Sequence, residues 1–281
     1  MRVAVWVNPI LSADVGVRIN RDRHTADPID GAYASNPSDD AAVAEALSLD
    51  GAERIGVFAM GKQQVEPFLR DYLAAGVDEA TRIWDAEFDG IDDLARARIV
   101  AAAVRQWSAD VVVCGDRLGD TGANVLGPMV AELLSTPQVT GVVRMAAETD
   151  QLVVQRRADG FVETVRCPVP TVVAVDRGRP LPYPTLPNRL RARTTAIEEL
   201  GFGSLEIDSS QPTQSQLEVL SVSTPKPQRK APFDSRPALD RTIALLLGGS
   251  GSTARGTVLD GTSPDTARDV AERCLQALGI A

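Results

Sequence analysis

The chain has 281 residues, 44% hydrophobic and 24% charged, which is an ordinary composition for a globular protein. Its formal net charge of −9 at pH 7 argues against nucleic-acid binding, which needs a basic surface. No apolar run approaches the roughly 20 residues of a membrane span, and the first strand pattern is too short for a signal peptide. We therefore expect a cytoplasmic protein that is not integral to a membrane. Three cysteines without metal-site spacing and one histidine predict no metal site.

Strand and helix patterns alternate through the first half of the chain. Strands are predicted at residues 3–7, 54–60, 82–84 and 111–114, and helices at 39–49, 65–75, 91–107 and up to about 134. Such alternation is typical of a doubly wound α/β fold, in which helices cover both faces of a mostly parallel sheet.

The pattern then changes to consecutive strands. Strands are predicted at residues 139–147, 152–157, 161–167 and 171–175, with hairpin-type links between them. They indicate extra strands that continue or flank the parallel sheet. A loop rich in proline follows at residues 180–187, and a helix is predicted at 190–200.

The last third of the chain has a different composition. Residues 201–240 are rich in Ser, Gln and Pro but include an apolar stretch at 217–222, which predicts an extended arm that lies on another subunit. A strand at 243–247 and a helix at 264–278 are predicted beyond it. We therefore expect a nucleotide-binding α/β domain at 1–200, a partner-contacting arm at 201–240 and a C-terminal strand–helix segment at 241–281.

The loop at residues 115–128 joins a buried strand to a helix start. Its glycines and polar residues gather free backbone N–H groups at the positive end of a helix dipole, where a phosphate or nucleotide can bind. The Gly-Lys-Ser/Thr ending of a P-loop is absent, and the loop does not follow the first strand as a Rossmann fingerprint does. Taken alone, a simple strand-to-helix turn explains the loop equally well.

Two further motifs have both a structural and a functional interpretation. At residues 36–40, Asn36 suits an N-cap, Pro37 the first helical position and Asp39 the first turn; this is a well-formed helix start, or one wall of a nucleotide site. The acidic turn disfavours phosphate, so it would face a sugar or base. At 185–193, the alternatives are a solvated helix and a docking element that binds acidic partners. Its residues are Leu186, Arg189, Arg191 and Arg193.

The order of these motifs is similar to that in a known family. Residues 36–47 resemble the Asn-Pro-Phe-(Asp/Cys)-Glu-x-Ala-x-Glu-Glu-Ala-Leu signature of the electron transfer flavoprotein (ETF) beta-subunit family, which includes the FixA-type proteins. Residues 115–131 resemble its second signature. Residues 185–188 resemble its partner-recognition loop, and residues 227–229 the Pro-Gln-Arg of its C-terminal arm.

The resemblance implies an adenine nucleotide alpha hydrolase-like sheet and a heterodimer with an ETF alpha subunit that carries most contacts to FAD. The beta subunit would hold AMP or, in bifurcating members, a second FAD. Electrons would pass from an acyl-CoA-type or other flavin dehydrogenase to an ETF-quinone oxidoreductase-like acceptor, with no catalytic residue in this chain. The implied cofactor-binding residues are Trp6, Asn36, Pro37, Ser38, Asp39, Met60, Gly61, Gly115, Asp116, Arg117, Leu118, Gly119, Asp120, Thr121, Gly122, Ala123, Asn124, Val125 and Leu126.

Several positions depart from the family pattern. Ser38 replaces an aromatic residue, Ala13 stands near the place of a tyrosine, Trp6 occupies a small-residue position, and Asp116 replaces Lys or Arg. A carboxylate at 116 would repel phosphate unless Arg117 compensates. The alternatives are therefore a FixA-type bifurcating subunit with its own FAD and a nucleotide-binding paralogue without redox function. An ATP-cleaving ligase on a related fold has little support, because residues 8–11 lack its Ser-Gly-Gly loop.

Overall fold

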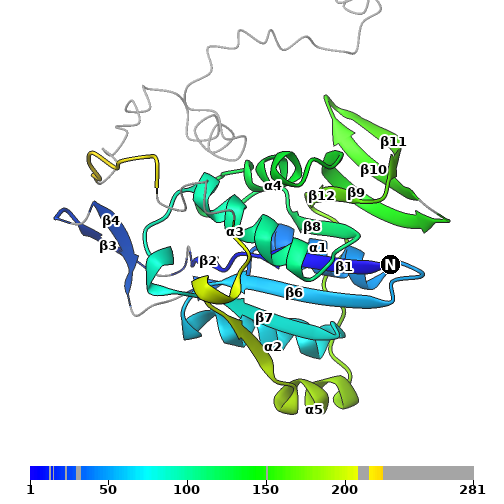
Figure 1. Cartoon of the computed structure of the whole chain (residues 1–281), viewed down its shortest axis with the longest axis horizontal. Helices are drawn as coiled ribbons and strands as arrows, with labels where there is room; N and C mark the ends of the chain where they lie inside the picture. Colours follow the sequence, from blue (N-terminus) through cyan, green and yellow to red (C-terminus); the bar gives the residue numbers. More distant parts are fainter. Residues whose placement is uncertain are drawn as a thin grey trace, which may run out of the picture. The chain divides into compact units, whose positions relative to one another are not determined.

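The computed structural model describes residues 1–223 apart from 13, 15, 23, 30–32, 150 and 208–214 (Figure 1). The chain divides into two compact units, Met1–Thr224 and Pro225–Ala281. The strand predicted at 243–247, the helix at 264–278 and the arm motif at 227–229 lie outside the described residues, as does Ala13. The predicted domain limits at 200 and 240 stay predictions.

A nine-stranded sheet forms the centre of the first unit, in the order β11-β10-β9-β12-β8-β1-β6-β7-β13. Neighbouring strands run parallel throughout the part of this order that begins with β9 and ends with β13. Strands β10 and β11 extend the sheet beyond β9 and pair antiparallel. The predicted doubly wound, mostly parallel fold with extra strands is thus confirmed. The strands are β1 (Arg2–Val7), β6 (Arg54–Met60), β7 (Glu79–Ile83), β8 (Val111–Gly115), β9 (Gln138–Glu148), β10 (Gln151–Ala158), β11 (Phe161–Pro168), β12 (Thr171–Val175) and β13 (Ile197–Leu200).

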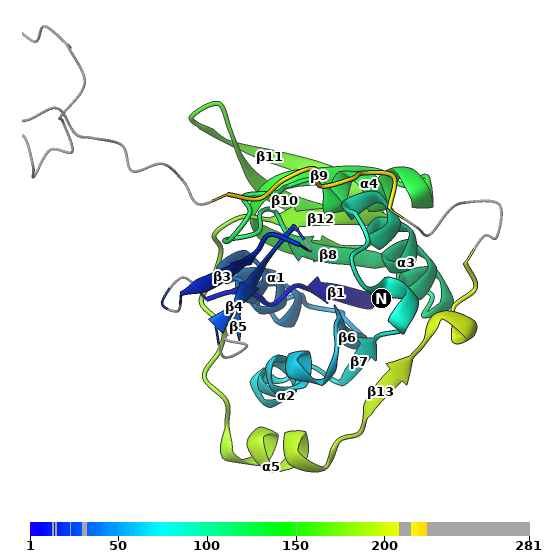
Figure 2. The same cartoon turned by 90° about the vertical axis from the view of Figure 1, so that its left-hand side faces the viewer.

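Helices cover both faces of this sheet. In Figure 2, α1 and α2 lie on one face, and α3 and α4 lie on the other. The helices are α1 (Pro37–Leu47), α2 (Glu66–Ala75), α3 (Asp93–Gln106), α4 (Leu126–Leu134) and α5 (Leu186–Thr194), with short 3₁₀ turns η2 (Gln63–Val65), η3 (Ala86–Phe88) and η4 (Phe202–Ser204). Among the helices of the described residues, none combines the length and the apolarity that crossing a bilayer requires.

Strand β1 shows how the two faces are filled. Val3, Val5 and Val7 are buried in the core under α1 and α2, whereas Ala4 and Trp6 are buried in the core under α3 and α4. Successive side chains of a strand point to opposite faces, so a strand covered on both sides is apolar throughout. Each fully buried valine stabilises the fold by about 1.5–3 kcal/mol relative to an exposed one.

Short hairpins between β1 and α1 were not predicted. Strand β2 (Ile10–Leu11) pairs with β5 (Tyr33–Ala34), and β3 (Val17–Asn20) pairs with β4 (Thr25–Pro28), both antiparallel. In Figures 1 and 2 the β3–β4 hairpin projects from the body of the unit. Its sequence is polar and has no sustained alternation of apolar and polar residues, so it carries no strand pattern.

The helix predicted at 190–200 is wrong in its limits. Helix α5 spans Leu186–Thr194, and β13 (Ile197–Leu200) then pairs in parallel with the sheet strand β7. The β-branched Thr195 and Ile197 favour extended backbone, and the pairing satisfies the backbone groups at the edge of β7. An ion pair of 2.7 Å between Arg82 Nη2 and Glu199 Oε1 fixes the added strand. The charge pattern predicted a helix to residue 200, whereas pairing of residues 197–200 with β7 ends the helix at Thr194.

A buried carboxylate joins α1 to the antiparallel extension of the sheet. Glu45 is fully buried and accepts hydrogen bonds from the Met145 backbone N–H (3.1 Å), Arg144 Nη1 (3.1 Å) and Arg179 Nε (3.2 Å). A buried charge needs such partners, because an unpaired one is costly. Glu45 thus fixes α1, and with it the helix start at residue 37, against β9 and the segment after β12.

Candidate functional site

The candidate site lies where the carboxyl ends of the parallel strands β1, β6 and β8 meet. In doubly wound sheets ligands bind in the crevice at this edge, where neighbouring strands connect to opposite faces. The chain leaves β1 toward α1, and it leaves β8 toward α4 on the opposite face. Three segments predicted from separate motifs, at residues 36–39, 60–61 and 115–126, come together here.

Asp39 ties two strand ends together. Its Oδ2 accepts a hydrogen bond of 2.7 Å from the Asn8 N–H after β1, and its Oδ1 accepts one of 3.0 Å from the Gly115 N–H at the end of β8. A Cβ at position 115 would lie 2.2 Å from Asp39 Oδ1, so only glycine permits this contact. The predicted acidic first turn is therefore part of the framework of the site, and its carboxylate is buried.

Burial raises the pKa of Asp39 from 3.8 to about 7. The hydrogen bonds from Asn8, Asn36 and Gly115 oppose this rise because they favour the carboxylate, and the neighbouring charge of Asp40 adds to it. Asp39, which holds the ends of β1 and β8 together, therefore titrates near neutral pH. Perturbed groups of this kind concentrate at functional sites.

Asn36 stands at the N-cap of α1, as predicted, but its side chain does not cap the helix. Instead, Nδ2 donates a hydrogen bond of 3.0 Å to the Arg117 carbonyl, which joins the start of α1 to the loop after β8. Its Oδ1 is buried and has no hydrogen-bond partner within the described part of the chain. A buried acceptor without a partner has a free-energy cost, which a ligand donor would remove.

The loop from 116 to 125 is held closed by its own backbone and by one carboxylate. The Leu118 N–H donates to the Ala123 carbonyl (2.9 Å), and the Gly122 N–H donates to the Leu118 carbonyl (2.9 Å). Asp120 Oδ2 accepts from the Leu11 N–H on β2 (3.1 Å), and Asp120 Oδ1 accepts from the Thr121 N–H (2.7 Å). Both oxygens of Asp120 are thus engaged in holding the loop.

Asp116 also has a structural partner. Its Oδ1 accepts a hydrogen bond of 2.9 Å from the Gly141 N–H, and its own N–H donates to the Val175 carbonyl at 2.7 Å. Gly141 has a φ of 68°, and a Cβ there would lie 2.8 Å from the Arg157 carbonyl oxygen. The carboxylate that replaces a basic residue of the family therefore binds the start of β9, while the neighbouring Arg117 is exposed.

Two adjoining hollows lie at this edge of the sheet. The first is called the α4 hollow because it lies at the start of α4. The N-cap of α4, Val125, makes no side-chain cap hydrogen bond, so the helix start presents backbone N–H groups there. The α4 hollow is lined by Asn8, Asp93, Arg96, Gly115, Leu118, Ala123, Asn124, Val125 and Leu126.

The second hollow, of about 760 Å³, is called the β6–β7 hollow because it opens beyond the ends of these strands. It shares Asn8 and Arg96 with the α4 hollow, so the two adjoin each other. Three aromatic side chains give it planar apolar surface. It is lined by Asn8, Pro9, Tyr33, Met60, Gly61, Gln64, Val65, Trp84, Phe88, Asp89, Gly90, Ile91 and Arg96.

The predicted residue Trp6 does not line either hollow. Its indole is fully buried in the core under α3 and α4, and Nε1 donates a hydrogen bond of 3.0 Å to Asn8 Oδ1. Trp6 therefore orients Asn8, which lines both hollows. Motif reasoning missed Asn8, although it directly follows the first strand. It also missed Arg96 and Trp84, which nothing in the sequence sets apart from ordinary helix and loop residues.

The predicted docking residues divide into two groups. Leu186 is 70% exposed at the start of α5. Arg189 Nη2 donates to the Tyr183 hydroxyl (3.2 Å), and its guanidinium lies 5.2 Å from the ring centroid of Tyr183. Arg191 instead faces α2, where Nη2 donates to the carbonyls of Leu73 (3.1 Å) and Val77 (2.7 Å). Arg191 thus holds α5 in place, whereas Arg193 is exposed.

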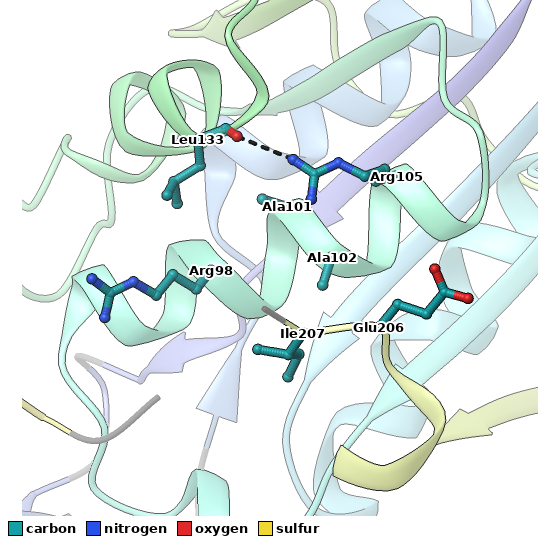
Figure 3. A pocket seen from close by; sticks show the side chains of 7 residues that line it. All are labelled: Arg98, Ala101, Ala102, Arg105, Leu133, Glu206 and Ile207. Carbon is teal, nitrogen blue, oxygen red and sulfur yellow. Dashed lines mark hydrogen bonds between the residues drawn. The ribbon is translucent and has the colours of Figure 1, made fainter. Parts of the chain in front are cut away.

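A separate hollow of about 480 Å³ lies over α3 and α4 (Figure 3). Arg105 crosses it and donates from Nη2 to the Leu133 carbonyl at 3.1 Å. None of the predicted site residues lines this hollow, which is formed by Arg98, Ala101, Ala102, Arg105, Leu133, Glu206 and Ile207. The candidate site is therefore the strand-end pair of hollows.

Comparison with known proteins agrees with the order of the motifs. The model of the electron transfer flavoprotein domain matches residues 30–203. The human electron transfer flavoprotein subunit beta is 33% identical over 238 residues, which cover 82% of this chain and 91% of the human protein. The subunit beta of Thermoanaerobacterium thermosaccharolyticum is 32% identical over 206 residues, which cover 69% of this chain and 77% of that protein. The chain belongs to the electron transfer flavoprotein beta-subunit family.

Proposed function

We propose that this chain is the nucleotide-holding subunit of an electron transfer flavoprotein and binds AMP, or a second FAD, in the two strand-end hollows. The observation that carries the proposal is that residues 60–61 and 115–126 line two adjoining hollows, and that residues 36–39 are hydrogen-bonded to the strand end and the loop beside them. The cleft has a helix start and Arg96 at the α4 hollow, and aromatic surface at the β6–β7 hollow. This arrangement, polar in the α4 hollow and apolar in the β6–β7 hollow, suits a phosphate joined to a planar base.

The residues present fit such a ligand. The backbone N–H of Leu126, at the start of α4, and the guanidinium of Arg96 would bind phosphate oxygens. The aromatic side chains of the β6–β7 hollow would bind a planar ring. Gly119 keeps the loop close to β2, because a Cβ there would lie 2.9 Å from Ile10 Cδ1. Asn36 Oδ1 supplies a buried acceptor in the same region. A bound flavin would supply the redox chemistry, while this chain binds, orients and shields it.

The partners follow from the family and from the exposed surface of α5. The chain pairs with an ETF alpha subunit that carries most contacts to the electron-transferring FAD, and the arm after residue 200 contacts that subunit. Leu186, with exposed arginines beside it, docks an acyl-CoA-type or other flavin dehydrogenase. Electrons then pass to an ETF-quinone oxidoreductase-like acceptor. We place the complex in the cytoplasm.

A FixA-type bifurcating subunit is the second candidate function. The lining of the β6–β7 hollow favours it, because Tyr33, Trp84 and Phe88 together offer several aromatic surfaces to a planar ring system such as a flavin. A nucleotide-binding paralogue without redox function is the remaining alternative.

One preparation separates these candidates. The full chain is co-expressed with its alpha subunit, the complex is purified, and flavin and AMP are quantified after denaturation. One FAD and one AMP per heterodimer support the conventional carrier, and two FAD support the bifurcating type. A stable complex without flavin, or with a flavin that no dehydrogenase reduces, contradicts electron transfer and leaves the paralogue.

A further inference from the structure

Arg96 stands at the junction of the two strand-end hollows. It lines both, and it is the one Arg or Lys among the described residues that line either of them. It lies in the first turn of α3, where the helix dipole disfavours a cation. Side chains that break a local preference without structural gain concentrate at functional positions. The location of this positive charge therefore indicates that the hollows bind an anionic ligand.

The contacts of the Arg96 guanidinium leave it able to bind an anion. Its ion pair is with Asp93, at 3.9 Å between Nη1 and Oδ1, and both side chains are partly exposed. A contact of this length between residues three apart on a helix is weak. A guanidinium has five N–H donors in a planar fork that matches a phosphate, so a phosphate oxygen can compete with Asp93 for them.

The backbone under Arg96 is held rigidly. Asp92 caps α3, with Oδ1 accepting from the Ala95 N–H at 2.9 Å, and its Oδ2 accepts from the Gln216 N–H at 2.6 Å. The first turn of α3 is thus fixed at its cap, directly before Arg96. A preorganised cation loses less freedom on binding than one on a mobile loop.

Trp84 gives the β6–β7 hollow its largest aromatic side chain. The indole is half-buried and lines the hollow. The Lys62 ammonium lies 5.0 Å from its ring centroid, and Lys62 also pairs with Asp89 at 3.5 Å. Because the ring is partly exposed and bounded by Met60 and Gly61 in the same hollow, it offers a flat surface on which a planar ring can stack.

We infer that Arg96 is the residue that selects phosphorylated ligands, and that Trp84 is the platform for the planar ring of the same ligand. The inference rests on the proposed function, which places a nucleotide in these hollows. It adds the residues that discriminate a nucleotide from its nucleoside. Arg96 reads the phosphate, and Trp84 recognises the ring without regard to phosphate.

The test compares AMP with adenosine as probes. Calorimetric titration of the full chain, stripped of bound nucleotide, gives both dissociation constants for the wild type and each variant. Arg96→Gln should weaken AMP binding roughly tenfold and leave adenosine binding unchanged, because a charge-assisted hydrogen bond is lost. Arg96→Lys should recover part of the preference for AMP. Asp93→Asn should strengthen AMP binding a few-fold, since it removes a competing carboxylate.

Trp84 has a separate readout. Trp84→Leu should weaken AMP and adenosine by the same factor. Of the other two tryptophans, Trp6 is fully buried and Trp107 lines neither hollow, so the fluorescence change on AMP binding should come mainly from Trp84 and should disappear in Trp84→Phe. Circular dichroism melting of every variant identifies any that fail to fold. If Arg96→Gln or Trp84→Leu does so, the more conservative Arg96→Lys and Trp84→Phe still test the two assignments.

The outcomes separate the inference from the function on which it rests. If wild-type chain binds neither AMP nor FAD, alone or with its alpha subunit, both are overturned. If wild type binds AMP but Arg96→Gln changes AMP and adenosine affinity equally, or changes neither, the assignment of Arg96 alone is overturned. An unchanged fluorescence response in Trp84→Phe overturns the assignment of Trp84.

Discussion

The strand-end cleft and the α5 surface differ in how their polar and apolar groups are used. In the cleft, Asp39 and Asp116 are bonded to backbone N–H groups and shape the site from within. At α5, Leu186 on the helix is 70% exposed and Tyr183 in the loop before it is 84% exposed, and these side chains contribute little to the core. A ligand site must be preorganised by internal bonds, whereas a docking surface must keep its contacts for the partner. Substitutions in the two regions should therefore separate stability from function.

Gly115→Ala should have the largest effect. The added Cβ would lie 2.2 Å from Asp39 Oδ1, so β8 or α1 must move. We expect a loss of about 3 kcal/mol in the free energy of unfolding, which urea denaturation measures. Gly203→Ala is the matched control, because nothing lies within 4 Å of a Cβ at that position. Equal stability of Gly115→Ala and wild type would show that the Asp39 contact is not tight.

Asp39→Asn should change the pH dependence of stability. In the folded chain the pKa of Asp39 is about 7, above its ordinary value of 3.8. The proton that the folded state binds therefore stabilises it fully below pH 3.8. That stabilisation is lost as pH rises through 7. The variant should be about 2 kcal/mol less stable at low pH, because it replaces one acceptor oxygen.

Because Asn does not titrate, the stability of wild type relative to Asp39→Asn should fall between pH 4 and pH 7, until the variant is the more stable of the two, and should stay constant above pH 8. Urea denaturation at pH 4.5, 6, 7 and 8 measures it. A gap that is independent of pH would mean that Asp39 has an ordinary pKa in the folded chain.

Arg191→Met should have a smaller effect, on the attachment of α5. The substitution removes hydrogen bonds to the Leu73 and Val77 carbonyls, and we expect a loss of about 1 kcal/mol. Arg193→Met, on the exposed side of the same helix, should change stability by less than about 0.5 kcal/mol. Thermal unfolding of both variants compares them. The reverse order would mean that Arg191 is free to serve a partner, as its place in the motif suggested.

Leu186→Ala should have the smallest effect on stability, less than about 0.5 kcal/mol, because the side chain is largely exposed. It should nevertheless lower the dehydrogenase-dependent kcat/KM of the heterodimer about tenfold, since exposed apolar anchors dominate docking. Leu190→Ala, one turn further along α5, is the control. A normal kcat/KM for Leu186→Ala would contradict the docking role.

Local patterns predicted much of the fold. The apolar runs that became β1, β6 and β8 are buried on both faces, and their β-branched residues leave little choice but a covered parallel strand. The order of the motifs predicted the family, which the comparisons confirm. The limits of α5 were not predictable, because pairing of β13 with β7 is a long-range contact without a local signal.

The candidate site was predicted as segments and not as contacts. The family resemblance implied that residues 36–39 and 115–126 belong to one site, and the structure brings them to one edge of the sheet. It also moves Trp6 from the predicted lining into the core, and adds Asn8, Arg96 and Trp84. Which side chain reaches a hollow depends on strand face and helix rotation, which the sequence does not state.

The sequence alone determined the class of fold, the family and the segments that border the cleft, because these depend on local periodicity and on short motifs. Tertiary structure decided what each polar residue does. Asp116, expected to oppose a phosphate, binds the Gly141 N–H, and Asp39 joins β1 to β8. The physical reason is that a buried carboxylate must find donors, and the donors of Asp39 and Asp116 lie 25 or more residues away along the chain.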